Sequence, residues 1–191
     1  MRVLLLNALK EDSGVNNFIE EIITKELAFL ACQSKLINVR EKEIEYCTGC
    51  GYCGEKEPGV CIKKDDMQEI YPEMANSEMY ILISSISFGG FHSELKKVID
   101  RICPLALSTY NMHRGELHHV MRYPNPRHLL SIGFMFDDIP EQKKTYKLAT
   151  ERIEKAFFVE KAATLTFRKD QERDFLAEEI KKAISELELI L

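Results

Sequence analysis

The chain has 191 residues, of which 45% are hydrophobic and 30% charged, a balance that is ordinary for a folded globular protein and excludes an intrinsically disordered one. Its net charge of −5 gives no general attraction for nucleic acid, and no apolar run is long enough to span a membrane. The first residues do not resemble a secretion signal, so we expect a cytoplasmic protein whose partners are neither nucleic acid nor membrane.

The first part of the chain predicts two short strands around one helix. Residues 3–6 are an unbroken apolar run bounded by polar residues, which is typical of a strand buried on both faces. Apolar residues then recur at helical spacing from Phe18 to Leu30, with charged residues on the other side. A second strand is expected over residues 35–39.

Four of the six cysteines lie together in residues 47–61, directly after the second strand. They are Cys47, Cys50, Cys53 and Cys61. Gly49 and Gly51 allow the short loop between them to turn the sulfurs inward. In ferredoxins of the bacterial type, a Cys-x-x-Cys-x-x-Cys run supplies three ligands of a [4Fe–4S] cluster, so the spacing favours such a cluster with Cys61 as the fourth ligand. A zinc site and reduced thiols without metal stay open as alternatives, whereas a disulfide framework is less suited to a charged chain of this size.

Two further units of secondary structure follow the cysteine loop. Asp65 and Asp66 precede an amphipathic helix, and Asp65 is expected to cap it. Residues 79–83 form a third apolar strand, which leads into a small polar loop and another helix. Cys32 and Cys103, which lie outside the cysteine loop, are expected to be buried thiols without a chemical role.

Residues 103–127 interrupt this pattern and are predicted to be an insertion, because they contain prolines and histidines but no sustained periodicity. The histidines are His113, His118 and His119, which would either bind an anion or a metal or be ordinary loop residues. Apolar strands resume over residues 128–134 and 163–167, each followed by a helix. Five strands that alternate with five amphipathic helices predict a single α/β domain over residues 1–191, with a doubly wound five-stranded parallel sheet.

With these elements in place, the chain resembles the flavodoxin-like NAD(P)H-dependent FMN reductases and, within them, the iron–sulfur flavoproteins. The resemblance rests on the four cysteines, on Asp65-Asp66-Met67, and on the run from Phe88 to Lys96 that leads into Ile99-Asp100-Arg101. It implies strand order 2-1-3-4-5, with the cysteine loop after strand 2 and the insertion before strand 4. It also implies a homodimer or homotetramer with a small-molecule or protein redox partner.

By the same resemblance, three loops at the carboxyl ends of the strands hold FMN. The candidate residues are Lys10, Ser13, Gly14, Asn16 and Asn17 in the first loop, Ser85, Ser87, Phe88, Gly89, Gly90 and Phe91 in the second, and Gly133 in the third. The first loop would bind the phosphate at a helix N-terminus. Phe88 or Phe91 would cover the flavin ring, unless the phenylalanine is core. His92 would either donate to a flavin edge or sit at the helix cap.

The resemblance implies an FMN-dependent oxidoreductase that passes electrons between NAD(P)H or another donor, the flavin and a [4Fe–4S] cluster, with no side chain nominated as an acid or base. An alternative is a flavodoxin-fold protein that acts as a non-catalytic binding or regulatory subunit. It is favoured by residues 8–12, which read Ala-Leu-Lys-Glu-Asp where the family has Gly-Ser-Pro-Arg. A third possibility is a plain flavin reductase whose cysteines bind zinc or nothing.

Overall fold

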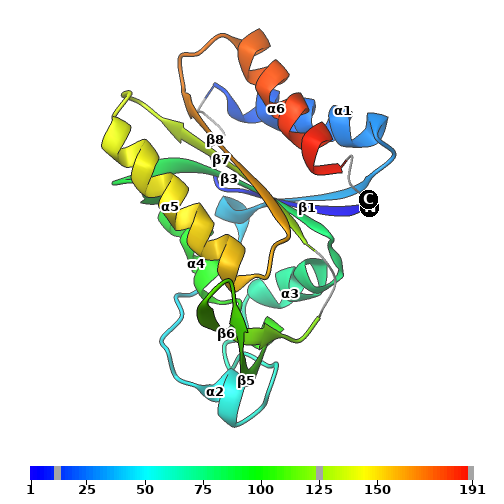
Figure 1. Ribbon diagram of the computed structural model, residues 1–191, viewed down its shortest axis with the longest axis vertical. Helices are drawn as coiled ribbons and strands as arrows, with labels where there is room; N and C mark the ends of the chain where they lie inside the picture. Colours follow the sequence, from blue (N-terminus) through cyan, green and yellow to red (C-terminus); the bar gives the residue numbers. More distant parts are fainter. Residues whose placement is uncertain (11–13, 124–126, 189–191) are drawn as a thin grey trace.

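The computed structural model describes residues 1–10, 14–123 and 127–188. A mostly parallel sheet forms its middle layer, and helices cover both faces (Figure 1). The α/β class with a mostly parallel sheet is therefore confirmed. Among the described residues, no helix has the length and apolar character needed to cross a membrane.

The central sheet contains five parallel strands in the order β2-β1-β3-β7-β8. Their bounds are β1 Arg2–Asn7, β2 Gln33–Asn38, β3 Met79–Ser87, β7 His128–Met135 and β8 Lys161–Arg168. A sixth strand, β4 (Gly90–Phe91), pairs antiparallel with the end of β3. The sequence predicted five strands in this sheet, whereas the structure has six. The extra strand arises because β3 continues past residue 83 and the chain turns back on it at Gly89, whose φ is +78°.

Two helices cover one face of the sheet and three cover the other (Figure 1). On the first face lie α1 (Asn16–Phe29) and α6 (Arg173–Glu188); on the second lie α3 (Met67–Asn76), α4 (Ser93–Asp100) and α5 (Pro140–Ala156). Alternate residues of β1 serve the two layers: Leu4 and Leu6 pack under α3, whereas Val3 and Leu5 pack under α1. Burial on both faces explains why the strand is apolar without alternation.

The predicted insertion is more ordered than the sequence indicated. It contains an antiparallel pair, β5 (Ala106–His113) and β6 (Glu116–Met121), preceded by a 3-10 turn, η3 (Cys103–Leu105). Arg114 and Gly115 connect the strands with φ values of +48° and +79°, the left-handed pair that tight hairpin turns require. Neither strand contains a fully buried residue, so no run of buried residues marked them in the sequence. Pro124 and Pro126, two of the prolines of this insertion, lie outside the described residues.

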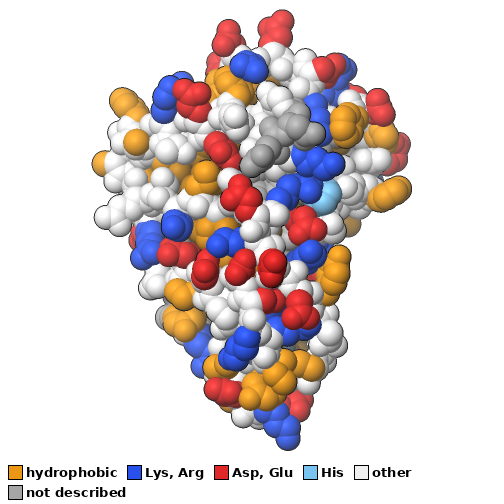
Figure 2. Space-filling view, turned by 180° about the vertical axis from the view of Figure 1, so that it is seen from behind, with side chains coloured by type: hydrophobic (Ala, Val, Ile, Leu, Met, Phe, Trp, Pro, Cys, Tyr) orange, Lys and Arg blue, Asp and Glu red, His pale blue; other side chains and the backbone are white. Residues whose placement is uncertain are grey.

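The hairpin lies beside the cysteine loop at one end of the molecule, together with the short helix α2 (Tyr52–Glu55) (Figure 1). The Ser108 hydroxyl in β5 donates to the Gly54 carbonyl in α2 at 2.6 Å, which joins the two segments. Seen from behind, the surface has a band of acidic side chains across its middle and a group of hydrophobic side chains at the narrow end (Figure 2). The insertion and the cysteine loop therefore form one structural unit.

Candidate functional site

The cysteines of the loop face a common cavity of about 460 Å³ between the loop, η3 and β5. Gly49 and Gly51 have φ values of +63° and +71°, so both take the left-handed conformation that the predicted turn requires. The cavity is lined by five sulfur-bearing residues, Cys47, Cys50, Cys53, Cys61 and Cys103, and by polar and apolar residues that include Arg101, Ser108, Tyr110 and His119. The four predicted ligands thus share one space, and a fifth cysteine joins them.

Cys103 corrects a prediction made from the sequence, which placed it among buried thiols. It is an exposed residue on the wall of the cavity. The reason is that α4 ends at Asp100, so Cys103 begins η3 and is not on the buried face of a helix. Cys32 also differs from the expectation, because it is partly exposed. It does not line this cavity.

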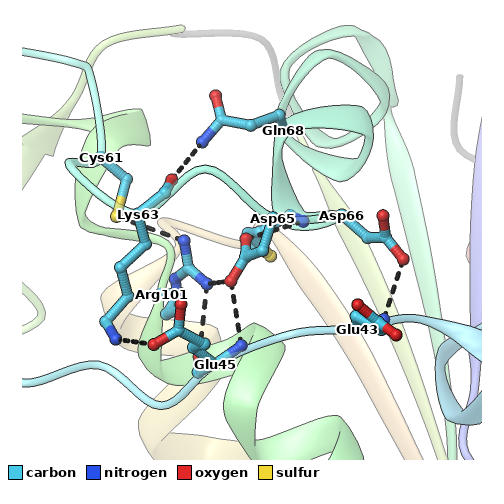
Figure 3. Close-up of polar contacts among 9 residues, drawn as sticks. Glu43, Glu45, Cys61, Lys63, Asp65, Asp66, Gln68 and Arg101 are labelled. Carbon is cyan, nitrogen blue, oxygen red and sulfur yellow. Dashed lines mark hydrogen bonds and ion pairs between the residues drawn. The ribbon is translucent and has the colours of Figure 1, made fainter.

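The sulfur of Cys61 lies beside the guanidinium of Arg101 (Figure 3). Nη2 of Arg101 donates to Cys61 Sγ at 3.3 Å, although the two residues are 40 positions apart in the chain. Burial raises the pKa of the Cys61 thiol, but the Lys63 amide and the Arg101 guanidinium outweigh this effect and bring the pKa below its ordinary value. By contrast, desolvation by the surrounding protein atoms raises the pKa values of Cys53 and of Cys103, although the Cys103 residue is exposed at the cavity wall. Cys61 is therefore the thiol most easily ionised among these three.

Arg101 is itself held by a buried ion pair with Asp65, whose side chain is 8% exposed while that of Arg101 is 1% exposed. Nη1 of Arg101 also donates to the Glu45 carbonyl at 3.3 Å. This pair corrects the expected role of Asp65. One of its oxygens accepts from the Met67 amide at 3.2 Å, but the other accepts from Arg101 and from the Glu45 amide, and the helix cap position belongs to Asp66.

The donor set around the cavity suits a soft metal centre, because thiolates are the ligands of iron–sulfur clusters and of zinc. Within residues 1–10, 14–123 and 127–188, no three His, Cys, Asp or Glu side chains are grouped so that they would hold a metal ion. Five cysteines nevertheless line the same cavity, so the residue types fit a thiolate-bound centre, either an iron–sulfur cluster or zinc.

The histidines of the insertion are explained by packing. The His113 ring stacks near Phe158, with 4.5 Å between the ring centroids, and His118 Nε2 lies 3.3 Å from a Glu116 oxygen. His119 is the one histidine of the three on the cavity wall, where its Nδ1 lies 2.8 Å from the Leu107 carbonyl oxygen. The metal or anion site considered for these residues gains no support from the described part of the chain.

The first candidate flavin loop leads into the N-terminus of α1. Gly14 and Asn17 line a cavity of about 260 Å³ with Phe18, Glu21 and Arg173. The cap position of the helix is Val15, and among the described residues no side chain caps it. Ser13 lies outside the described residues.

Two other candidate residues of this loop differ in their exposure to solvent. Lys10 is exposed, whereas Asn16 is buried and its side-chain oxygen accepts from Asn7 Nδ2 at 2.6 Å. The same Asn7 nitrogen donates to Glu20 at 2.6 Å, which ties the end of β1 to α1. Asn16 therefore has a structural role whatever the loop binds.

The second candidate loop separates the two phenylalanines that the sequence left equivalent. Phe91 is 8% exposed and packs on Tyr146, with ring centroids 4.9 Å apart. Phe88 is 99% exposed and takes a left-handed conformation with φ of +49°. Phe91 is thus a core residue, and Phe88 is the aromatic residue of this loop that is free to contact a ligand.

The small residues around Phe88 have individual reasons for their size. A Cβ on Gly89 would lie 2.7 Å from Thr145 Cβ, and one on Gly133 would lie 2.7 Å from Ile86 Cδ1 and 2.8 Å from the Tyr146 ring. Gly133 is buried in β7, so its lack of a side chain serves packing against these neighbours. Ser85 is partly exposed, Gly90 is partly exposed, and Ser87 is exposed.

His92 occupies the N-cap of α4, where its Nδ1 accepts from the Glu94 amide at 3.3 Å. Its backbone amide donates to the Ser84 hydroxyl at 2.8 Å. Burial, with the positive charges of Arg40 and Lys10 nearby, lowers the pKa of the imidazole below its ordinary value. Of the two roles considered, helix capping is the one that the structure shows.

Sequence reasoning missed the part played by Arg101 and the position of Cys103. The Asp-Arg pair at residues 100–101 carried part of the resemblance, yet nothing in its spacing linked Arg101 to Cys61 or Asp65. The available signal was a single arginine directly after a helix, followed two residues later by a cysteine.

Comparison with known proteins shows which families the sequence resembles. A family model described as NADPH-dependent FMN reductase matches residues 1–132. An iron–sulfur flavoprotein of Methanocaldococcus jannaschii is 30% identical over 107 residues, which are 56% of this chain and 54% of that protein. An iron–sulfur flavoprotein of Archaeoglobus fulgidus is 35% identical over 80 residues, 42% of this chain and 36% of that protein. The matches thus span about half or less of these relatives.

Among solved structures, the fold is similar to that of an NAD(P)H:quinone oxidoreductase from Methanothermobacter marburgensis. The TM-score is 0.70 at 12% identity, and the alignment covers 98% of this chain and 96% of that one. At this identity the likeness concerns the fold alone.

Proposed function

This chain belongs to the NADPH-dependent FMN reductase family, and we propose that it is an iron–sulfur flavoprotein that exchanges electrons between FMN and a [4Fe–4S] cluster. The observation that carries the proposal is the convergence of Cys47, Cys50, Cys53 and Cys61 on one cavity. The relatives named above support it, because segments of 107 and 80 residues are 30% and 35% identical to iron–sulfur flavoproteins. The proposed electron donor is NAD(P)H or another reductant, and the acceptor is a small molecule or a redox protein.

The cluster would be held by these four cysteines. A bound cluster carries one electron at a time, whereas a flavin accepts one or two, so the pair converts two-electron chemistry into single steps. The chain's own contribution at this site is to hold the thiols around the cavity with the left-handed glycines and to keep the Cys61 sulfur hydrogen-bonded to Arg101. The exposed hairpin face next to the loop is proposed to pack in a homodimer or homotetramer, and the compartment is proposed to be the cytoplasm.

The FMN would lie across the carboxyl ends of β1 and β3. The uncapped N-terminus of α1 offers amides to the phosphate, with Gly14 and Asn17 beside it and Arg173 as a nearby positive charge. Phe88 supports this placement, because a fully exposed aromatic ring held in a left-handed conformation is costly unless it contacts a ligand or partner. Lys10, Ser13, Ser85, Ser87, Gly89 and Gly90 are the remaining proposed contacts.

A second candidate function is a flavodoxin-fold subunit that binds no flavin. It is favoured by the packing roles of Asn16, Phe91 and Gly133, since three residues predicted to bind FMN are explained without it. A third, a flavin reductase with zinc or free thiols, differs from the leading proposal only in the metal. The three candidates differ in what the purified protein contains. The leading proposal requires iron, sulfide and flavin, the second lacks flavin, and the third contains flavin with zinc or no metal.

The test is anaerobic purification followed by visible spectra and by quantitation of iron, acid-labile sulfide, zinc and flavin in one sample. We expect iron and sulfide in about equal amounts together with flavin. Cysteine-to-serine variants of Cys47, Cys50, Cys53 and Cys61 should each lose most of the iron. The matched control is Cys32→Ser, because Cys32 lies outside the cavity and should retain iron. A protein free of iron and sulfide would refute the cluster, and one that also fails to take up added FMN would leave the binding subunit.

A further inference from the structure

We infer that Arg101 is the positioning residue that holds the Cys61 sulfur in place and raises the reduction potential of the centre bound there. This inference rests on the proposed function and assigns a role to a residue outside the cysteine motif. It begins from the contact in which Arg101 Nη2 donates to Cys61 Sγ at 3.3 Å (Figure 3).

The guanidinium is aimed at the sulfur by contacts on its other nitrogen. Nη1 forms the ion pair with Asp65 and donates to the Glu45 carbonyl, and these two partners come from different segments of the chain. Asp65 is held in turn by the Glu45 amide at 2.9 Å and the Met67 amide at 3.2 Å. A planar guanidinium presents its donors in a fixed fork, so holding one nitrogen orients the other. An ammonium group in the same place would not be oriented in this way.

The balance of charge also favours an effect on the sulfur. Asp65 supplies the counter-charge of Arg101, which is 2% exposed as a residue. The nitrogen that faces Cys61 still carries a donor proton and part of the positive charge. Hydrogen bonds to ligand sulfurs are one of the factors that set the potential of iron–sulfur centres. They stabilise the reduced form more because it carries more negative charge, and the potential rises.

Tyr71 of α3 is a second polar group in the same place. Its hydroxyl is buried and has no hydrogen-bond partner in the described part of the chain, a condition that is uncommon for a buried donor. Burial raises the pKa of this phenol, and the nearby Cys61 sulfur raises it further. The contact that carries the inference is nevertheless the one between Arg101 and Cys61.

The experiment is a spectroelectrochemical titration of the anaerobically purified, iron-loaded protein, with iron and sulfide measured on each sample. Arg101→Gln should lower the midpoint potential by a tenfold or larger change in the reduction equilibrium, which is about 59 mV for one electron. Arg101→Lys keeps the charge but not the fork, so it should fall between Arg101→Gln and the wild type. Lys42→Gln is the control: it removes a positive charge from a different segment, where the Lys42 ammonium pairs with Glu69 at 2.6 Å, and its potential should stay at the wild-type value.

Arg101→Gln removes a buried cation, so its fold is checked by circular dichroism and by its iron content. Arg101→Lys covers the case in which that variant fails to fold, because it keeps a positive charge beside Asp65. Unchanged potentials in the iron-loaded Arg101 variants would overturn the inference. A wild-type protein without iron and sulfide would instead overturn the proposed function, which distinguishes the two failures.

Discussion

The ion pair between Asp65 and Arg101 makes a quantitative prediction about stability. Replacing Asp65 with alanine leaves a guanidinium that is 1% exposed without its counter-charge. Removing one partner of a buried pair costs about 3–5 kcal/mol, because the remaining charge is neither solvated nor paired. Proteins of this kind have about 5–15 kcal/mol of stability in total, so the loss would be a large share of it.

The assay is urea unfolding followed by circular dichroism, with wild type and variant matched for iron content. At a slope of about 3 kcal/mol per molar urea, the expected loss lowers the unfolding midpoint by more than about 1 M. Glu21→Ala is the matched control, since Glu21 pairs with Lys25 on the surface, where the two side chains are 60% and 73% exposed. Its midpoint should equal that of the wild type. Equal midpoints for Asp65→Ala and Glu21→Ala would refute the argument from burial.

The same pair predicts how stability depends on pH. Burial raises the pKa of Asp65, but Arg101 and the Glu45 and Met67 amides outweigh it, so the folded-state pKa lies below its ordinary value. A carboxyl whose folded pKa is lower than its unfolded value of about 3.9 contributes its full stability above that value and loses it as the pH falls through the folded pKa. Wild type and Asp65→Ala should therefore differ most at neutral pH and converge in strong acid. A difference that stays constant with pH would contradict this account.

Two further substitutions test the packing around the second candidate flavin loop. Gly89→Ala should cost about 2–4 kcal/mol, since it combines a φ of +78° with a Cβ 2.7 Å from Thr145; Gly115→Ala, at φ of +79° with open space around it, should cost only about 1–2 kcal/mol by the same unfolding assay. Equal losses would show that the contact with Thr145 is unimportant. Tyr146→Phe removes a buried hydroxyl that lies 2.8 Å from Ser131 Oγ and should cost about 1–2 kcal/mol, and a variant as stable as the wild type would mean that the hydroxyl makes no net contribution.

The layered fold could be predicted from the pattern of apolar residues along the chain. Residues 3–6 are apolar at every position because β1 is covered on both faces, and Ile19, Ile23 and Leu27 repeat every four residues because α1 buries one stripe. These periods depend only on neighbours along the sequence. The four clustered cysteines were visible for the same reason, since their ligand spacing lies within one short loop.

The sequence did not reveal the elements whose side chains are mostly exposed. The hairpin β5–β6 lacks a buried face, and β4 has two residues, so neither produces a recognisable period. Their existence follows from turn geometry at Gly89 and Gly115 and from contacts with the rest of the protein. A hairpin of this kind is stabilised by what it packs on, which here includes the cysteine loop and α5.

The polar contacts of the site were decided by tertiary structure alone. Arg101 meets Asp65 across 36 positions and Cys61 across 40, and Cys103 joins the cavity because α4 stops before it. Phe88 and Phe91 look alike in the sequence, yet one is fully exposed and the other is core. Such differences depend on where the sheet and helices bring distant segments together, whereas local periodicity records only which side of each segment is buried. The chain alone thus determined the layers and the cluster of thiols, and the packed structure determined which side chains surround them.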